Sequence, residues 1–292
     1  MQGMRRSGTT IVYDLLSRDP RWNMYYEPLS KGRPGAKGGG SGLQANDLMD
    51  KVRNFRQQFC AKNGLPVDDE AFNQGAPSQP ANEVTSSMPG FVVDYLQAMI
   101  QHQPPTAIKF TRMYCRVGIL AQIAPDALFA VLLRDPKAVV CSYMFGKSRV
   151  RAHLFPDADA FFTRRSQLNA WNSRRIAEAA ASLTGADIGD LTDVERILWL
   201  WTFKVGRTLA GAKQYFADQH LLLRHEALCD DPGSVMTNLY SRLAMPIDQG
   251  VIDFAVQHVR PNSVPDFCDD PRWQQALQRV GAIELMQQAG YL

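Results

Sequence analysis

Residues 3–10 read Gly-Met-Arg-Arg-Ser-Gly-Thr-Thr, and the interpretation of the whole chain starts from this stretch. Its glycines, Gly3 and Gly8, have the spacing of a loop that joins a strand to a helix and cradles a phosphate. Apolar residues at positions 12, 15 and 16 follow with the spacing of one helix face. Free N–H groups in the first turn of such a helix point at a bound anion. The sequence therefore predicts an oxyanion site at the first strand–helix junction.

The cations of this loop differ from those of a nucleotide triphosphatase. Such an enzyme has a lysine directly after the second glycine, where it reaches the β- and γ-phosphates of ATP. Here Thr9 occupies that position, and Arg5 and Arg6 lie inside the loop. The best apolar strand also ends in Arg134 and Asp135, with the cation first, unlike a Walker-B strand. We expect an oxyanion other than magnesium-bound ATP, with a nucleotide kinase or NTPase, or a non-catalytic nucleotide-binding protein, as the alternatives.

The rest of the chain alternates strands with helices. We expect strands at 1–4, 23–26, 107–110, 128–133 and 220–223, and helices at 48–59, 91–100, 117–124 and 137–145, with two long helices in 157–217. The continuously apolar segment 128–133 is typical of a strand covered on both faces of a parallel sheet. The predicted fold class is α/β: one domain over residues 1–292 with a P-loop-like three-layer fold, in which helices flank a central parallel β-sheet and form insertions.

Composition excludes several classes of protein. The chain has 292 residues, is 45% apolar and carries a net charge of +3, which supports a sizeable core but gives no reason to expect nucleic-acid binding. Its five cysteines are scattered without CxxC spacing, so neither a disulfide framework nor a zinc site is expected. No apolar run approaches the ~18–20 residues of a membrane span, and the early position of Gly3 leaves no room for a signal peptide. We therefore expect a cytoplasmic protein that needs no metal.

A second segment has the features of an anion site. Residues 133–143 read Leu-Arg-Asp-Pro-Lys-Ala-Val-Val-Cys-Ser-Tyr. Arg134 ends a buried parallel strand, at the sheet edge where α/β proteins bind ligands. Pro136 then begins a helix whose free N-terminal donors face the same edge. Ser142 lies further along that helix and can direct its hydroxyl at the same anion. Two anion sites on two strand–helix junctions suit a ribose that carries 3′- and 5′-phosphates.

These two segments resemble the sulfotransferase family, which transfers a sulfuryl group from 3′-phosphoadenosine 5′-phosphosulfate (PAPS) to an acceptor hydroxyl. The family's 5′-phosphosulfate loop is typically Gly-x-Pro-Arg-Ser-Gly-Thr-Thr, or Pro-Lys-Ser-Gly-Thr-Thr in the cytosolic branch. Residues 6–10 match it, whereas Arg5 replaces the usual proline. Arg134 and Ser142 are eight positions apart, as in the family's 3′-phosphate segment.

A third segment is similar to the family's later strand and the stretch that follows it. Residues 223–228 read Leu-Arg-His-Glu-Ala-Leu, and His225 stands where a cofactor-contacting tyrosine is common. The resemblance implies that PAPS and its product, adenosine 3′,5′-bisphosphate (PAP), are bound by Arg5, Arg6, Ser7, Gly8, Thr9, Thr10, Arg134, Ser142 and His225. By analogy with phosphoryl transfer, Arg6 and the loop amides would also stabilise charge during in-line displacement.

The family offers two kinds of general base. Cytosolic members use a histidine in a Lys-Thr-His stretch, but residues 109–112 read Lys-Phe-Thr-Arg, so Thr111 occupies the histidine position. Other branches, including carbohydrate sulfotransferases, carry Glu-Pro-Leu after the second strand, and residues 26–29 resemble that stretch. We therefore expect Glu27 to be the base, with burial raising its pKa toward the working pH. Lys109 either stabilises the leaving oxygen or only ends its strand.

Acceptor recognition is expected to involve residues 28–90 and 146–195, which carry no family motif. The glycine-rich stretch 31–42 either folds over the acceptor or is a plain loop. Segment 147–175 holds seven cations and two acidic residues, a local charge of +5. An anionic acceptor and a solvated basic helix face both explain this charge. The acceptor is a hydroxyl on a glycan, lipid, small molecule or carrier, and the sequence specifies neither the acceptor nor the oligomeric state.

Overall fold

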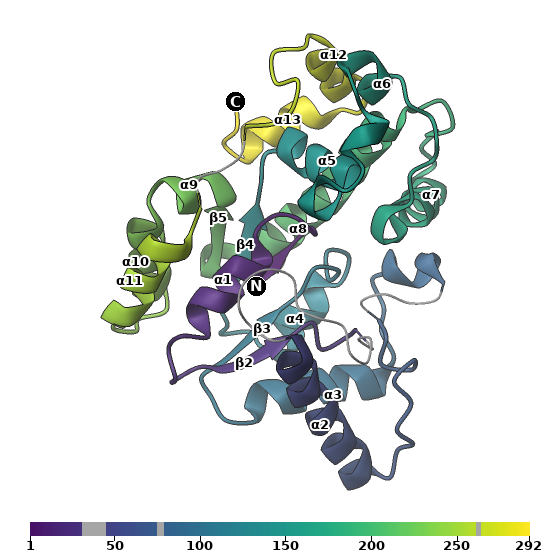
Figure 1. Ribbon diagram of the computed structural model, residues 1–292. Helices are drawn as coiled ribbons and strands as arrows, with labels where there is room; N and C mark the ends of the chain where they lie inside the picture. Colours follow the sequence, from purple (N-terminus) through teal and green to yellow (C-terminus); the bar gives the residue numbers. More distant parts are fainter. Residues whose placement is uncertain (31–44, 75–78, 261–263) are drawn as a thin grey trace.

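Parallel strands form the centre of the fold in a computed structural model, which describes residues 1–30, 45–74, 79–260 and 264–292 (Figure 1). The described strands are β1 (Gln2–Gly3), β2 (Asn23–Tyr26), β3 (Thr106–Lys109), β4 (Phe129–Leu133) and β5 (His220–Arg224). One set of parallel pairs joins β1, β4 and β5, and another joins β2 and β3. A parallel bridge between Gln2 and Phe110 links the two sets. The order across the described strands is therefore β2-β3-β1-β4-β5.

Strand β4 shows why the fold has three layers. All five of its residues are buried, and alternate side chains enter different cores because successive strand residues point to opposite faces. Val131 packs in one core with Trp201 of helix α8 (Asp193–Phe216). Leu132 packs in the other core with Val12 of helix α1 (Thr9–Leu16). Helices thus cover both faces of the strand, which confirms the predicted parallel α/β sandwich (Figure 1).

Most of the predicted elements are confirmed. The other described α-helices are α2 (Ala45–Asn63), α3 (Gly90–Gln101), α4 (Val117–Ile123), α5 (Pro136–Phe145), α6 (Ala158–Phe162), α7 (Ser173–Thr184), α9 (His225–Asp230), α10 (Pro232–Arg242), α11 (Gln249–His258), α12 (Arg272–Arg279) and α13 (Ala282–Gln288). No helix in the described ranges is long and apolar enough to cross a lipid bilayer. The expected loop at 31–42 falls outside the described residues.

Two details of the prediction are wrong. Segment 157–217 is not simply two long helices, because a non-helical stretch separates the short α6 from α7 and α8. Gln167, Trp171 and Asn172 have positive φ in this stretch, a conformation that no α-helix continues through. The apolar run 220–223 indicates a buried strand; it does form a strand, but only Leu223 in it is buried. Among the described strands, β5 lies at the edge of the sheet beside β4, and most of its residues are partly or fully exposed.

The parallel arrangement brings the predicted site residues to one edge of the sheet. Glu27 directly follows β2, and Lys109 is the last residue of β3. The loop that contains Arg6 follows β1, and Arg134 follows β4. Because the carboxyl ends of parallel strands share an edge, residues far apart in the sequence meet there.

Candidate active site

The loop after β1 folds as a turn that needs its glycines. Gly8 has φ of 85°, in the left-handed region, and a Cβ atom on it would collide with the ring of His225. A Cβ on Gly3 would lie 2.7 Å from the backbone oxygen of Leu132 in the neighbouring strand. Arg6 also has a positive φ of 73° although it is not glycine. The loop is therefore held tightly between β4 and α9, as a phosphate cradle requires.

Several polar atoms in and beside this loop have no protein partner. The Nε atom of Arg5 and the hydroxyls of Ser7 and Thr111 are buried without a hydrogen-bond partner among the described residues. Ser7 and Thr111 are only 1% and 3% exposed. Buried polar groups are almost always hydrogen bonded, so unpartnered donors at a predicted anion loop fit a bound oxyanion. These atoms meet the requirement for a phosphosulfate site, and Thr111 is a donor that the sequence analysis did not predict.

The residues predicted for the second anion site come together with the first loop. The Nε atom of Arg6 donates to the hydroxyl of Ser142 at 2.5 Å, and Arg134 Nη1 donates to the backbone oxygen of Arg6 at 3.1 Å. All three residues line one pocket of about 300 Å³. Desolvation and the nearby charge of Arg134 lower the pKa of Arg6. Cations gathered around a pocket in this way favour an anionic ligand.

Helix α5 presents Ser142 to this pocket. It begins at Pro136, and the carboxylate of Asp135 accepts hydrogen bonds from the backbone N–H groups of Lys137 at 2.6 Å and Ala138 at 3.3 Å. This N-cap fixes where the helix starts, and it therefore fixes the position of Ser142 relative to Arg134.

Glu27 and Lys109 form a nearly buried ion pair. Lys109 Nζ lies 2.6 Å from Glu27 Oε1, and the backbone N–H of Thr111 donates to Glu27 Oε2 at 3.3 Å. The side chains of Lys109 and Glu27 are 3% and 12% exposed. The ammonium group also lies 4.1 Å from the centre of the Tyr26 ring. The structure thus places the predicted base and the predicted cation in direct contact.

The expected rise in the pKa of Glu27 is wrong. Burial alone would raise this pKa, but the charges of Lys109 and Arg5 and the hydrogen bonds to the carboxylate outweigh burial. The net result is a pKa below the usual glutamate value. Opposite charges within a few ångströms favour the ionised form. The sequence shows only that Tyr26 is next to Glu27, so the pairing with these cations could not be predicted from it. Glu27 is therefore ionised and paired at neutral pH.

His225 lies against the loop after β1, next to Gly8. Its Nδ1 and Nε2 atoms are 3.6 Å and 3.9 Å from the sulfur of Cys229, one turn further along α9. No group of three or more His, Cys, Asp or Glu side chains in the described part of the chain is arranged to hold a metal. The cofactor contact expected of His225 stays a prediction, and the structure places the His225 ring beside Gly8. In the first turn of α1, Thr9 is buried and the Thr10 hydroxyl is 3.5 Å from the Tyr26 hydroxyl.

A buried charged cluster near the end of β3 was not predicted. Glu83 accepts hydrogen bonds from Arg112 at 2.5 Å, Tyr114 at 2.7 Å and Lys204 at 3.0 Å. Glu83 is 1% exposed, and Arg112 also donates to the backbone oxygen of Trp171 at 3.2 Å. No sequence signal identifies this cluster, because Glu83, the pair Arg112 and Tyr114, and Lys204 come from three separate segments that only the fold brings together.

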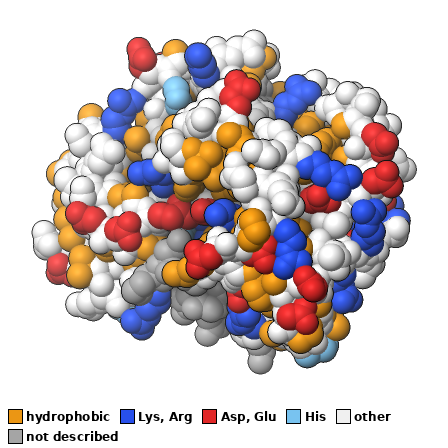
Figure 2. Space-filling view, turned by 90° about the horizontal axis from the view of Figure 1, so that it is seen from above, with side chains coloured by type: hydrophobic (Ala, Val, Ile, Leu, Met, Phe, Trp, Pro, Cys, Tyr) orange, Lys and Arg blue, Asp and Glu red, His pale blue; other side chains and the backbone are white. Residues whose placement is uncertain are grey.

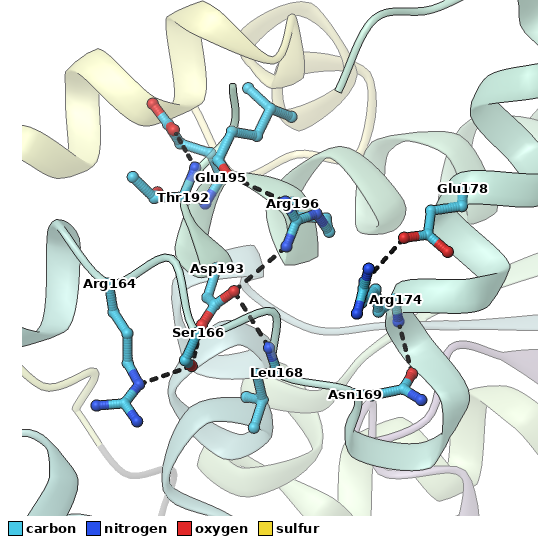
Figure 3. A network of polar contacts seen from close by, with 11 residues as sticks. Arg164, Ser166, Leu168, Asn169, Arg174, Glu178, Thr192, Asp193, Glu195 and Arg196 are labelled. Carbon is cyan, nitrogen blue, oxygen red and sulfur yellow. Dashed lines mark hydrogen bonds and ion pairs between the residues drawn. The ribbon is translucent and has the colours of Figure 1, made fainter. Parts of the chain in front are cut away.

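The segment that leads to Trp171 is fixed to the start of α8 (Figure 3). Asp193 accepts from the Ser166 hydroxyl at 2.7 Å and from the Leu168 backbone at 3.2 Å. The side chain of Asn169 accepts from the backbone of Arg174 at 3.1 Å. The Trp171 ring lies 5.6 Å from the guanidinium carbon of Arg6. Part of the predicted substrate-recognition insertion therefore reaches the phosphate loop.

The basic segment 147–175 is partly neutralised by its surroundings. Arg149 pairs with Asp266 and Arg174 with Glu178, each at 2.8 Å. Arg151 and Arg164 donate to backbone oxygens. The face that carries α6, α12 and α13 shows acidic and basic side chains side by side (Figure 2). The local excess of positive charge is therefore not one continuous basic patch.

Known proteins resemble this chain in sequence and in fold. The model of the Sulfotransferase family matches residues 1–152, more than half of the chain. The crystal structure of sulfotransferase STF9 from Mycobacterium avium aligns with 99% of this chain and 76% of its own, at a TM-score of 0.53 and 14% identity. The sulfotransferase domain from the curacin biosynthetic pathway aligns with 100% of this chain and 96% of its own, at a TM-score of 0.50 and 15% identity. No curated protein matches. With a family model that covers more than half of its residues, including both segments predicted to bind anions, the chain belongs to the sulfotransferase family.

Proposed function

We propose that this protein transfers a sulfuryl group from PAPS to an acceptor hydroxyl. The observation that carries the proposal is the contact between Arg6 and Ser142, together with the hydrogen bond from Arg134 to Arg6. It joins the loop after β1 to the helix after β4, and a nucleotide with phosphates on both its 3′ and 5′ positions needs two such adjacent sites. Membership of the sulfotransferase family supports the same conclusion.

The two anion sites divide the donor between them. In this proposal, the 5′-phosphosulfate is held by the loop amides and by Arg5, Ser7, Thr9 and Thr10, and His225 contacts the donor from beside Gly8. The 3′-phosphate is held by Arg134 and Ser142. Arg6 contacts both of these residues and lines the same pocket, so its charge acts between the two sites. PAPS supplies an activated sulfuryl group: the acceptor oxygen forms a bond to sulfur, the bond from sulfur to the 5′-phosphate breaks, and PAP leaves. The chain itself provides position and charge stabilisation.

Glu27 becomes a better base when negative charge is bound beside it. The charges of Lys109 and Arg5 hold the pKa of Glu27 down. When these cations face a bound polyanion, their effect on Glu27 weakens, and burial then raises the pKa of Glu27. The carboxylate can now accept the proton of the acceptor hydroxyl. Lys109, released from its pair, is free to stabilise the charge on the leaving oxygen.

Both predicted insertions converge close to this pair. Glu83 belongs to segment 28–90 and Trp171 to segment 146–195, and Arg112 donates to both of them. Arg112 lies three residues after Lys109. This convergence supports an acceptor site built from both insertions at the end of β3, within one domain that spans residues 1–292. An anionic acceptor is compatible with the exposed cations of segment 147–175, among them Arg165 and Arg175.

Incubation with labelled PAPS and a panel of acceptors tests the activity. The panel holds glycans, lipids, phenols and carrier-bound hydroxyls, and mass spectrometry detects the gain of one sulfuryl group. Calorimetry provides a second, acceptor-independent test, because a sulfotransferase should bind PAP without metal in preference to magnesium-bound ATP. Preference for magnesium-bound ATP would support a nucleotide kinase instead. PAP binding without transfer to any acceptor would support a non-catalytic nucleotide-binding protein.

A further inference from the structure

The pocket beside Arg6, Arg134 and Ser142 has a second wall that no sequence motif predicts. This wall contains Arg149, from the turn after α5, and Asp266, from the segment before α12. The two residues are 117 positions apart in the sequence and form a two-pronged ion pair. Arg149 Nη1 lies 2.9 Å from Asp266 Oδ2, and Arg149 Nη2 lies 2.8 Å from Asp266 Oδ1.

The backbone of the turn after α5 directs Arg149 into this wall. Gly146, Ser148 and Arg149 have φ values of 76°, 53° and 55°, all in the left-handed region. Left-handed conformations at non-glycine residues are unfavourable, and they persist where the surrounding structure holds them. The guanidinium of Arg149 also lies 4.0 Å from the centre of the Phe145 ring. Both its plane and its position are therefore fixed from two sides.

The charge of the pocket suits a phosphate monoester. Its charged lining residues are three arginines (Arg6, Arg134 and Arg149) and one aspartate (Asp266), a net charge of +2. A phosphate monoester carries about −1.5 to −2 at neutral pH, whereas a ribose 3′-hydroxyl is neutral. Without Arg149, the pocket would offer a net charge of only +1 to this group. Arg149 thus supplies the charge that matches a phosphate dianion.

Arg149 also has hydrogen-bond donors left for a ligand. A guanidinium has five N–H groups, and the pair with Asp266 uses two of them. Asp266 therefore orients Arg149 and leaves some of its N–H groups available to a ligand. The other two arginines already have protein contacts, since Arg6 donates to Ser142 and Arg134 donates to the backbone of Arg6.

We propose that Arg149 is a specificity-determining residue, oriented by Asp266, that makes the pocket select a nucleotide with a 3′-phosphate over one with a 3′-hydroxyl. The inference rests on the proposed function, because it assigns the 3′-phosphate of PAPS and PAP to this pocket. It also assigns a role to one cation of the basic segment 147–175: Arg149 faces the donor.

Calorimetry on Arg149→Gln with two ligands tests this role. The ligands are PAP and adenosine 5′-phosphate, which lacks the 3′-phosphate, both at one fixed ionic strength. We expect Arg149→Gln to bind PAP about tenfold more weakly while its affinity for adenosine 5′-phosphate stays unchanged. Arg175→Gln is the matched control, because Arg175 is an exposed cation of the same segment that does not line the pocket. It should bind both ligands as the wild type does.

A second variant, Arg149→Lys, distinguishes a loss of 3′-phosphate recognition from a loss of folding. It keeps the positive charge but cannot form the two-pronged pair with Asp266. We expect it to prefer PAP over adenosine 5′-phosphate more strongly than Arg149→Gln does. Equal preference in these two variants, or an Arg149→Gln protein with the wild-type preference, would contradict the role of Arg149. Failure of the wild type to bind PAP at all would instead contradict the proposed function.

Discussion

At the residue scale, the proposed role of Glu27 as a general base depends on its ion pair with Lys109. The carboxylate is nearly buried, yet the neighbouring cations keep its pKa below the usual glutamate value. A glutamate in this state holds no proton and has little tendency to accept one until the surrounding positive charge is compensated. The order of events in the proposed reaction follows: the polyanionic donor must bind before Glu27 can act as a base.

Replacing the carboxylate of Glu27 should separate binding from catalysis. Glu27→Gln removes the base but leaves the two anion sites, so we expect PAP affinity to stay within about twofold of wild type while turnover falls by about 10²–10⁴-fold. Calorimetry with PAP and a sulfuryl-transfer assay measure the two effects. Near-normal turnover in Glu27→Gln would exclude Glu27 as the general base.

The loop after β1 also depends on a single residue, Gly8, whose backbone is in the left-handed region. Gly8→Ala adds a Cβ both to a backbone at φ 85° and against the ring of His225. Gly64→Ala is the control, because Gly64 has φ 63° but open space around it. We expect Gly64→Ala to lower the free energy of unfolding by about 1 kcal/mol from backbone strain alone. Gly8→Ala should lower it further and also weaken PAP binding, as urea denaturation and calorimetry can measure; equal effects of both variants on stability and binding would contradict the proposed clash.

At the element scale, the cluster around Glu83 connects parts of the chain that do not pair as strands. Glu83 lies in a short turn of 3₁₀-helix (Pro80–Glu83), Lys204 in α8 and Arg112 just after β3. Arg112 in turn contacts the backbone of Trp171, whose ring lies near Arg6. The cluster therefore links the segments that carry Glu83 and Trp171 beside the loop after β1.

Removing the negative charge of this cluster should strongly destabilise the fold. Glu83→Gln leaves the buried cations of Arg112 and Lys204 without their counter-ion, and we expect the free energy of unfolding to fall by roughly 3–5 kcal/mol. The matched control is Glu178→Gln, which breaks the exposed pair with Arg174 and should cost less than about 1 kcal/mol. Urea denaturation at pH 7 compares the two; similar losses would mean that the Glu83 cluster contributes no more than a surface pair.

The ionisation of Glu83 should make the stability of the fold depend on pH. Burial alone would raise the pKa of Glu83, but the charges of Lys204 and Arg112 hold it below the usual 4.5. The unfolded chain therefore takes up this proton first as the pH falls, so the stabilisation is present above about pH 4.5 and is lost as the pH falls through the lower, folded-state value. Denaturation curves between pH 7 and pH 3 should show a steeper loss of stability for the wild type than for Glu83→Gln; parallel curves would contradict a lowered pKa.

At the scale of the whole molecule, the sequence predicts those parts of the site that lie at strand ends. Glu27, Lys109 and Arg134 each follow or end a strand whose apolar pattern is visible, so their common sheet edge follows from parallel topology. The pairs Arg149–Asp266 and Lys204–Glu83 are not predictable in this way, because each joins segments more than a hundred positions apart through tertiary contacts alone. The predicted rise in the pKa of Glu27 was wrong for the same reason, because the direction of the shift depends on which charges the fold brings close to the carboxylate.

A ligand that contacts two strand–helix junctions should stabilise the whole fold. PAP at 100 times its Kd should raise the free energy of unfolding by about 2.7 kcal/mol, if it binds only the folded state. Arg6→Ala and Arg134→Ala each remove charged hydrogen bonds to the ligand, and each should weaken PAP binding about tenfold or more. At the same PAP concentration, the melting temperature of either variant should therefore rise less than that of the wild type. Magnesium-bound ATP at this concentration serves as the control, and a shift as large as that with PAP would mean that the two junctions do not form a site for a 3′,5′-bisphosphate.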